Sequence, residues 1–106
     1  TFISAPLECP FACLDRELLS PSEEVDITFV DMHAEATSEK YTMLRAFDGR
    51  VQAIVGTHTH VQTADEQVTP AGTAYITDAG MTGCDQGVIG MCSEVAIKRF
   101  RTGLPE

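Results

Sequence analysis

The stretch Val55-Gly56-Thr57-His58-Thr59-His60-Val61-Gln62 directly follows a short apolar run, residues 51–55, and holds two of the three histidines of the chain. Side chains of an extended backbone alternate between two faces, so His58 and His60 are expected to point to the same side. Two imidazoles on one side of a strand end can bind a transition-metal ion. A His-x-His pair also occurs by chance, so this pair alone does not decide between a metal site and ordinary surface histidines.

The third histidine, His33, follows another apolar run in the same way. Residues 25–30 are rich in β-branched and aromatic side chains and predict a strand, whereas residues 37–48 predict a helix that Gly49 terminates. Residues 51–55 predict a second, buried strand. This strand–helix–strand pattern is that of a βαβ unit, whose parallel strands end at one edge of the sheet. We therefore expect the three histidines to meet at that edge, where α/β proteins bind ligands.

The remaining elements follow from turn residues and local patterns. The sequence predicts a helical turn or two over residues 14–19, a polar loop over 31–37, a strand over 73–77, a glycine-rich loop over 78–83 and a last helix over 93–102. Hydroxyl side chains predict the helix starts, at Thr37-Ser38-Glu39 and at Ser93, and Gly103 predicts the final stop. The fold class expected from this alternation is α/β.

Composition limits the classes of function. The chain has 106 residues, 43% hydrophobic and 22% charged, which is typical of one globular domain. Its formal charge of -9 argues against binding duplex nucleic acid on a basic face. No apolar run approaches the ~20 residues that span a bilayer. The four cysteines lack tight pairs on both sides, so we expect free, buried or half-buried thiols in a cytoplasmic protein.

Three neutral imidazoles would suit Zn, Mn, Fe, Co or Ni, and one open position could activate a water. A two-metal site would also need carboxylates, for which the nearby candidates are Asp31, Glu35 and Asp78. Asp31 is two residues before His33 and could instead orient that imidazole through its other nitrogen. Glu35 could be a ligand, a hydrogen-bond partner or a solvated loop residue. The glycine-rich loop after Asp78 could approach a ligand closely or could be an ordinary turn.

Five segments of the chain resemble one known family. They are residues 31–40, 48–51, 56–65, 72–78 and 80–83, which read DMHAEATSEK, DGRV, GTHTHVQTAD, GTAYITD and GMTG. These segments resemble the YmdB-like bacterial metallophosphoesterases, a branch of the calcineurin-like superfamily described as 2′,3′-cyclic-nucleotide phosphodiesterases. The resemblance extends over nearly the whole chain and is strongest from residue 25 to residue 91.

The resemblance implies part of a four-layered α/β/β/α sandwich with two divalent transition-metal ions, Mn, Fe or Zn, at the strand ends. His33 and His58 would bind one ion and His60 the other. The residues expected to line the site or to support the ligands are Asp31, Glu35, Thr57, Thr59 and Asp78. The implied reaction is attack on a small phosphodiester or nucleotide substrate by a metal-activated hydroxide.

The chain also departs from the family. The early Asp, the bridging acidic residue, the Asn and the general-acid histidine of the family are not in this sequence, so residues 1–106 resemble the C-terminal portion of a single metallophosphoesterase domain. We therefore expect little turnover by this chain alone, and self-association through a sheet face left without cover. Two alternatives are a non-catalytic metal-binding or regulatory α/β domain and a structural α/β domain with chance histidines.

Overall fold

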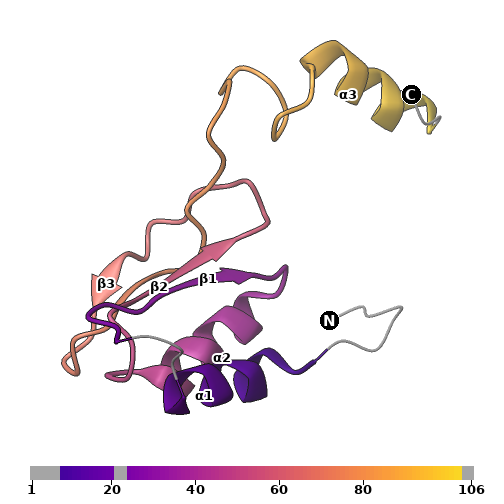
Figure 1. The fold of residues 1–106 in the computed structure, drawn as a ribbon. Helices are drawn as coiled ribbons and strands as arrows, with labels where there is room; N and C mark the ends of the chain where they lie inside the picture. The colour runs from indigo at the N-terminus through magenta and orange to yellow at the C-terminus, as the bar shows by residue number, and fades with distance from the viewer. Residues whose placement is uncertain (1–7, 21–23, 104–106) are drawn as a thin grey trace.

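The protein alternates helices and strands around one small sheet (Figure 1). The computed structural model describes residues 8–20 and 24–103. In chain order the elements are α1 (Pro10–Leu19), β1 (Phe29–His33), α2 (Thr37–Phe47), β2 (Ala53–Thr57), β3 (Gln67–Val68), β4 (Ala74–Ile76) and α3 (Ser93–Thr102). The α/β class predicted from the sequence is confirmed. The described part supplies one sheet and the helical layer on it; the other two layers that the resemblance implies are not among these residues.

The sheet has the strand order β1-β2-β4-β3. β1, β2 and β4 run parallel, and the short β3 pairs antiparallel with β4. β1 and β2 are aligned from the pair Phe29–Ala53 to the pair His33–Thr57. The predicted βαβ unit is thus confirmed, with α2 as the crossover. Because its strands are parallel, the carboxyl ends of β1, β2 and β4 meet at one edge.

The predicted strand bounds are shifted. The first strand was expected over residues 25–30 and the second over 51–55, but β1 covers Phe29–His33 and β2 covers Ala53–Thr57. Hydrophobic content set the expected bounds, whereas the observed bounds follow from hydrogen-bonded pairing between the two strands. His33 is therefore the last residue of β1 and not part of a following loop. The expected strand over residues 73–77 is confirmed as the shorter β4.

The helices confirm the expected order and the expected starts of α2 at Thr37 and α3 at Ser93, and they correct the start of α1. α1 begins at Pro10, earlier than the expected Leu14, because proline is tolerated in the first turn of a helix. α2 begins after Ala36 and α3 after Cys92, and neither start has a side-chain capping hydrogen bond. The predicted hydroxyl caps are therefore wrong. The predicted stop of α3 at Gly103 is confirmed, since this residue is left-handed and its N–H binds the Arg99 carbonyl.

One face of the sheet packs against the helices. Alternate strand residues Met32, Ile54 and Tyr75 point to this face and are buried. The same core contains Met43, Leu44, Phe47 and Val51, with Phe11, Leu14 and Leu18 of α1 packed against it. α1 and α2 lie side by side below the sheet in Figure 1. Burial of this cluster is what holds the two helices to the strands.

The opposite face of the sheet is open. Phe29 is 63% exposed and Val68 71% exposed. Between them, Val55 and Ile76 are only half-buried and line a shallow apolar hollow. Asp31, Thr57 and His33 alternate with buried residues and therefore lie on this open side, at its carboxyl edge.

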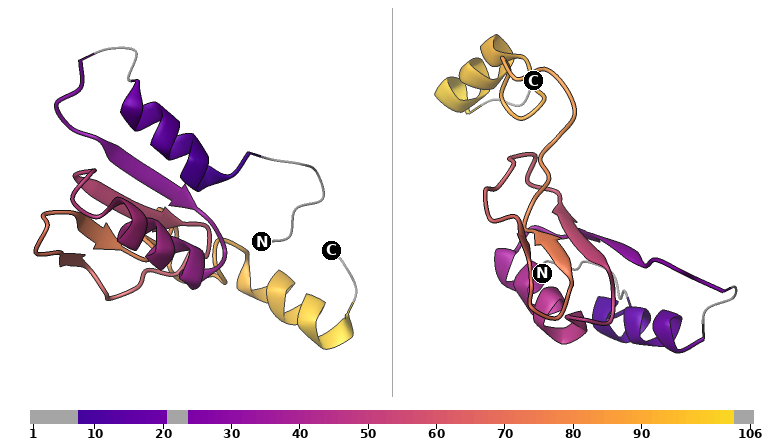
Figure 2. Two further views of the ribbon diagram at one scale, coloured as in Figure 1. Left: turned by 90° about the horizontal axis from the view of Figure 1, so that it is seen from below. Right: turned by 90° about the vertical axis from the view of Figure 1, so that its left-hand side faces the viewer.

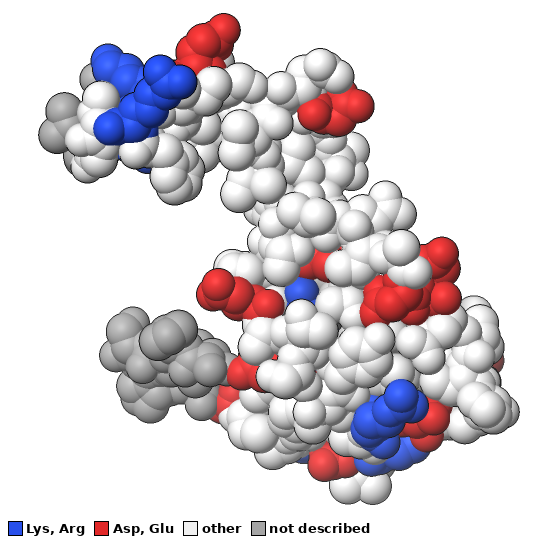
Figure 3. Space-filling view, turned by 180° about the vertical axis from the view of Figure 1, so that it is seen from behind, with Lys and Arg blue, Asp and Glu red and all other residues white. Residues whose placement is uncertain are grey.

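α3 lies apart from the sheet, at the end of the loop that follows β4 (Figure 2). Its Phe100 is 86% exposed. Lys98, Arg99 and Arg101 give this end of the molecule a cluster of basic side chains, whereas acidic side chains are spread over the body (Figure 3). The chain is acidic overall, but α3 is locally basic, which the overall composition did not show.

No helix in the described part of the chain is long and apolar enough to cross a membrane. All four cysteines have free thiols, as expected, but the expected burial is wrong for Cys9, Cys84 and Cys92, which are exposed, and only Cys13 is half-buried.

Candidate metal centre

Two histidines from neighbouring strands face each other at the carboxyl edge of the sheet. His33 ends β1, and His58 directly follows β2. The Nε2 atom of His33 and the Nδ1 atom of His58 are 3.2 Å apart, and the rings meet edge to face with their centroids 4.9 Å apart. The expectation that parallel strand ends bring these two distant residues together is confirmed.

A hydrogen-bond relay decides which nitrogen of His33 carries the proton. The Thr57 hydroxyl donates to Asp31 Oδ1 at 2.7 Å, and His33 Nδ1 lies 2.9 Å from the same hydroxyl oxygen. The only hydroxyl proton is used on the carboxylate, so Thr57 must accept its second bond from the Nδ1–H of His33. The Nε2 lone pair of His33 is thereby left unprotonated and directed at His58.

The spacing of the His33–His58 pair fits a shared metal ion. Two nitrogens bound at about 2.1 Å to one ion, at angles between octahedral and tetrahedral, lie roughly 3.0–3.4 Å apart. The observed separation of 3.2 Å lies in this range. Neutral imidazole nitrogens with the second nitrogen held by a hydrogen bond are the ligands that transition metals prefer. His33 meets this description through Thr57. In the structure the His58 Nδ1–H donates to the unprotonated Nε2 of His33, so His58 would serve as the second ligand with its proton moved to Nε2.

His60 is not part of this pair and binds elsewhere. His58 and His60 have φ values of 114° and 69°, so the backbone between them is bent and not extended. The expected extended geometry, with both imidazoles on one side, is wrong for this reason. The Nδ1 atom of His60 lies 2.9 Å from the Ile89 carbonyl, which can only accept, so Nδ1 carries the proton and Nε2 does not. The unprotonated Nε2 of His60 is thus separate from the His33–His58 pair.

Asp78 is buried beneath the histidine loop, residues 58–60. Its Oδ2 atom accepts from the Lys40 ammonium at 3.0 Å and from the Thr59 N–H at 3.0 Å, and Oδ1 accepts from the Gly80 N–H at 2.8 Å. Burial raises the pKa of Asp78, but the bonds from Gly80, Thr59 and Lys40 outweigh it and hold the pKa well below the ordinary range. Asp78, which was expected to line the site, therefore supports the histidine loop from beneath.

Lys40 was not among the residues expected at the site. It is 0% exposed, although it lies in a helix with the sequence TSEKYTMLRAF. Lys40 precedes Leu44 by four residues and Phe47 by seven, and this helical spacing places it on the apolar face of α2. A lysine at a core position of an amphipathic helix is the signal that could have identified it.

Asp65 forms a second hydrogen-bonding centre, also not expected. It accepts hydrogen bonds from the Thr63 hydroxyl at 2.7 Å, the Tyr41 hydroxyl at 3.0 Å and the Thr77 N–H at 3.1 Å, and also from the Thr77 hydroxyl. Burial raises the pKa of Asp65, but these donors together lower it below its ordinary value. The Thr63 hydroxyl oxygen in turn accepts from the Asp78 N–H, so the two carboxylates support one loop structure.

The other expected residues have lesser contacts. Glu35 is exposed, and the Thr59 hydroxyl lies 3.3 Å from the backbone oxygen of Val61. Across the described ranges 8–20 and 24–103, no three His, Cys, Asp or Glu side chains are grouped to hold an ion. The structure thus provides a histidine pair and a separate histidine, and His33 and His60 each have an unprotonated Nε2 opposite a hydrogen-bonded Nδ1.

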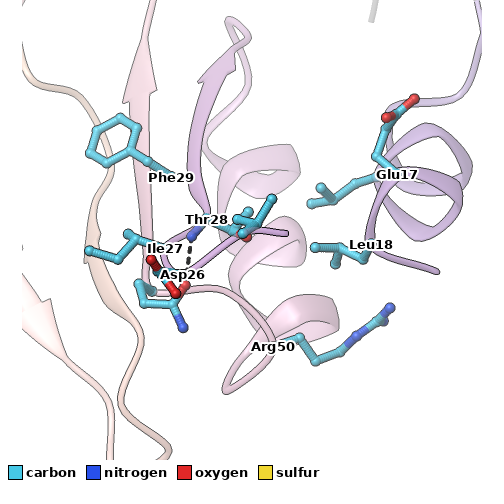
Figure 4. A pocket seen from close by; sticks show the side chains of 10 residues that line it. Glu17, Leu18, Asp26, Ile27, Thr28, Phe29 and Arg50 are labelled. Carbon is cyan, nitrogen blue, oxygen red and sulfur yellow. Dashed lines mark hydrogen bonds between the residues drawn. The ribbon is translucent and has the colours of Figure 1, made fainter. Parts of the chain in front are cut away.

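Hollows of the surface occur on both sides of the sheet. His60 lines one of about 220 Å³ together with Gln62, Met81 and Cys84. A pocket of about 600 Å³ lies between α1 and the segment before β1 (Figure 4). Because Phe29 begins β1 and His33 ends it, that pocket is at the opposite edge from the histidines. A further hollow of about 620 Å³, which extends from His60 to Ser93, also adjoins the candidate centre.

Comparison with known proteins identifies relatives over almost the whole chain. Residues 1–106 match the family described as YmdB-like protein. A relative from Bacillus subtilis (strain 168), named 2′,3′-cyclic-nucleotide 2′-phosphodiesterase, is 53% identical over 100 residues, which are 94% of this chain and 38% of the relative. The chain therefore spans little more than a third of that relative's length.

Two solved structures superpose on nearly the whole chain. A hypothetical protein from Thermus thermophilus superposes with a TM-score of 0.85 at 48% identity, covering 95% of this chain and 39% of that one. A protein of Mycoplasma pneumoniae, described as a novel phosphatase, superposes with a TM-score of 0.85 at 45% identity, covering 99% of this chain and 38% of that one.

The relay from Asp31 through Thr57 predicts a fixed tautomer of His33. In the unaltered chain at neutral pH, ¹⁵N NMR of the imidazoles should show His33 protonated at Nδ1. Thr57→Val keeps the side-chain shape but removes the acceptor, so the protonated nitrogen should change to Nε2 in a large fraction of molecules. Thr42→Val, which removes a helix-surface hydroxyl, should leave His33 unchanged. A Thr57→Val chain with the original His33 spectrum would refute the relay.

Acid should destabilise the fold through Asp65. Its pKa is lower in the folded chain than the value of about 3.9 expected after unfolding, so its stabilising effect is complete above about pH 5 and is lost as the pH falls below about 4. Asp65→Asn should lower the free energy of unfolding at pH 7 by about 2 kcal/mol and flatten its decline between about pH 5 and 3. Urea denaturation across this range measures both, with exposed Asp85→Asn as the control; equal slopes for the two variants would contradict this role.

Proposed function

Because this chain belongs to the YmdB-like protein family, we propose that it is the C-terminal portion of a metal-dependent phosphodiesterase that hydrolyses phosphodiesters such as 2′,3′-cyclic nucleotides. The observation that carries the proposal is the His33–His58 pair, whose facing nitrogens are 3.2 Å apart with the His33 proton held on the other side of the ring. The name of the Bacillus subtilis relative supports the substrate class.

The residues of this chain would supply three ligands to two divalent ions, Mn, Fe or Zn. His33 Nε2 and His58 Nδ1 would hold one ion, and His60 Nε2 the other. Such ions supply Lewis-acid stabilisation of charge on the phosphoryl oxygens. Thr57, supported by Asp31, holds the His33 ring in the correct tautomer, and the Ile89 carbonyl does the same for His60.

The remaining parts of the site would lie on the polypeptide that precedes these residues. A two-metal centre needs carboxylates that bridge the ions, and Asp78 is already fully engaged below the loop. The general-acid histidine of the family would also come from that segment, so no residue of this chain is assigned a catalytic proton transfer. We infer that the chain alone binds metal weakly and turns over little substrate.

The free cysteines and the net charge support proposals for the cellular compartment and for the kind of ligand. Four free cysteines favour a reducing compartment, and we propose that the protein is cytoplasmic. A formal charge of -9 favours a small nucleotide ligand bound through metal ions over duplex nucleic acid.

A second candidate is a non-catalytic metal-binding or regulatory α/β domain. The absence of a third grouped ligand within the described residues favours it over an enzyme that is complete in this chain. The two proposals differ in one outcome, which is hydrolysis once a segment with the missing carboxylates is joined to the chain.

Metal titration tests the proposed centre. Isothermal titration with Mn²⁺ should show one weakly held ion per chain, which His58→Ala abolishes because one nitrogen of the pair is lost. His60→Ala, the matched histidine control, should retain that ion because its ring points elsewhere. Two tightly held ions per chain would contradict the partial site, and binding that persists in His58→Ala would refute the pair as ligands. Hydrolysis of 2′,3′-cyclic AMP by the chain joined to the preceding segment of a family member would then exclude the regulatory alternative.

The open sheet face supports the proposal that the isolated chain self-associates. Exposed Phe29 and Val68 flank half-buried Val55 and Ile76, and apolar surface of this kind promotes association. Gel filtration should give a dimer or larger species. Phe29→Lys should shift it toward monomer, whereas Phe100→Lys on α3 should not. A monomer of the unaltered chain, or equal effects of the two substitutions, would count against the sheet face as the contact.

A further inference from the structure

We propose that Lys40 and Asp78 form a positioning pair that holds the histidine loop, residues 58–60, in the bent conformation that separates His58 from His60. Asp78 acts through the backbone N–H of Thr59, and Lys40 acts through Asp78. This inference deepens the proposed function and rests on it in one respect, that the histidine nitrogens bind metal ions.

The histidine loop needs external support because its backbone is unfavourable. His58 at φ 114° and His60 at φ 69° both lie outside the conformations that residues with a Cβ prefer. Such conformations persist only where the surroundings impose them, and they concentrate at functional sites. An extended backbone would place both rings on one side, so the bend is what directs His58 to His33 and His60 to Ile89.

Asp78 supplies that support between the two strained residues. Its carboxylate accepts the N–H of Thr59, which lies between His58 and His60, and also the N–H of Gly80 in the loop after β4. Both oxygens act as acceptors, so an asparagine could satisfy only one of these two N–H groups. A carboxylate at this position therefore ties the histidine loop to the neighbouring strand end.

Lys40 keeps this carboxylate in place. Its ammonium group lies 3.0 Å from Asp78 Oδ2, and the two side chains are 0% and 1% exposed. A buried carboxylate without a counter-charge would be strongly unfavourable, so the lysine permits a charged acceptor beneath the loop. The pair spans 38 residues and joins α2 to the exit of β4.

Gly56 leaves the space through which Lys40 reaches the carboxylate. A Cβ added at Gly56 would lie 2.9 Å from Lys40 Cδ and 1.6 Å from the Thr77 carbonyl oxygen. No side chain fits there without moving β2 away from β4. The glycine two residues before His58 thus has a packing reason that is independent of the ligand.

The test uses the 106-residue chain without metal, so that it does not depend on activity. Lys40→Met keeps the apolar stem and removes the charge. ¹H–¹³C and ¹H–¹⁵N NMR should then show altered ring signals and Thr59 amide exchange for the histidine loop, with the Ile54 methyl signals of the core unchanged. In a parallel titration, the affinity for Mn²⁺ should fall by about tenfold or more, as for other residues that orient metal ligands.

Val51→Ala is the matched control, since it removes a buried side chain at the far edge of the sheet and lowers stability without touching the loop. If it shifts the His58 and His60 signals as much as Lys40→Met does, the pair is only a contributor to stability and the proposal fails. If Lys40→Met does not fold, the double variant Lys40→Met with Asp78→Asn avoids a buried charge without a partner. Its His58 and His60 ring signals and its Thr59 amide exchange should then be altered relative to the unaltered chain, as expected for Lys40→Met. Absence of Mn²⁺ binding in the unaltered chain would refute the proposed function alone, because the metal-free spectra still test the positioning.

Discussion

The buried carboxylate of Asp78 joins the parts of this structure that surround the candidate metal centre. It links α2 through Lys40, the histidine loop through Thr59 and the exit of β4 through Gly80. Hydrogen bonds to a charged group contribute about 1.5–3 kcal/mol each, and breaking a buried ion pair by removing one partner costs roughly 3–5 kcal/mol. The two N–H bonds that Asp78 accepts are together comparable to the strain of the two positive-φ histidines, about 1–3 kcal/mol each, so the carboxylate can offset the strain of the bent loop.

The two faces of the sheet have separate roles. The helical face is filled by apolar side chains and provides the rigid support, whereas the open face carries both apolar strand residues and the Asp31–Thr57–His33 relay at its edge. A site on the side of the sheet that no helix covers is accessible to another segment of protein. The residues of the candidate metal centre are thus supported from within a chain that spans little more than a third of its Bacillus subtilis relative.

Much of the fold and part of the site could be predicted from local patterns. The hydrophobic runs before His33 and His58, with a helical segment between them, sufficed for the βαβ unit and for the meeting of these two residues, because parallel strands of one crossover must end at the same edge. The strand bounds were displaced by two or more residues, since hydrogen-bonded pairing and not hydrophobicity decides where a strand ends. Asp31 was considered either as a carboxylate of a metal site or as a residue that orients His33, and the intervening Thr57 hydroxyl came only from the register of β1 and β2.

The sequence by itself determined the α/β class, the chain order of the elements and the edge at which the histidines gather, because these depend on periodicity and on the handedness of crossovers. Only the tertiary structure decided that His58 and His60 diverge, that Lys40 is buried and that Asp65 and Asp78 act as hydrogen-bonding centres. Each of these results from contacts between residues far apart in the chain, such as the 38-residue separation of Lys40 from Asp78. Local preferences oppose a buried lysine and left-handed histidines, and tertiary hydrogen bonds overcome those preferences.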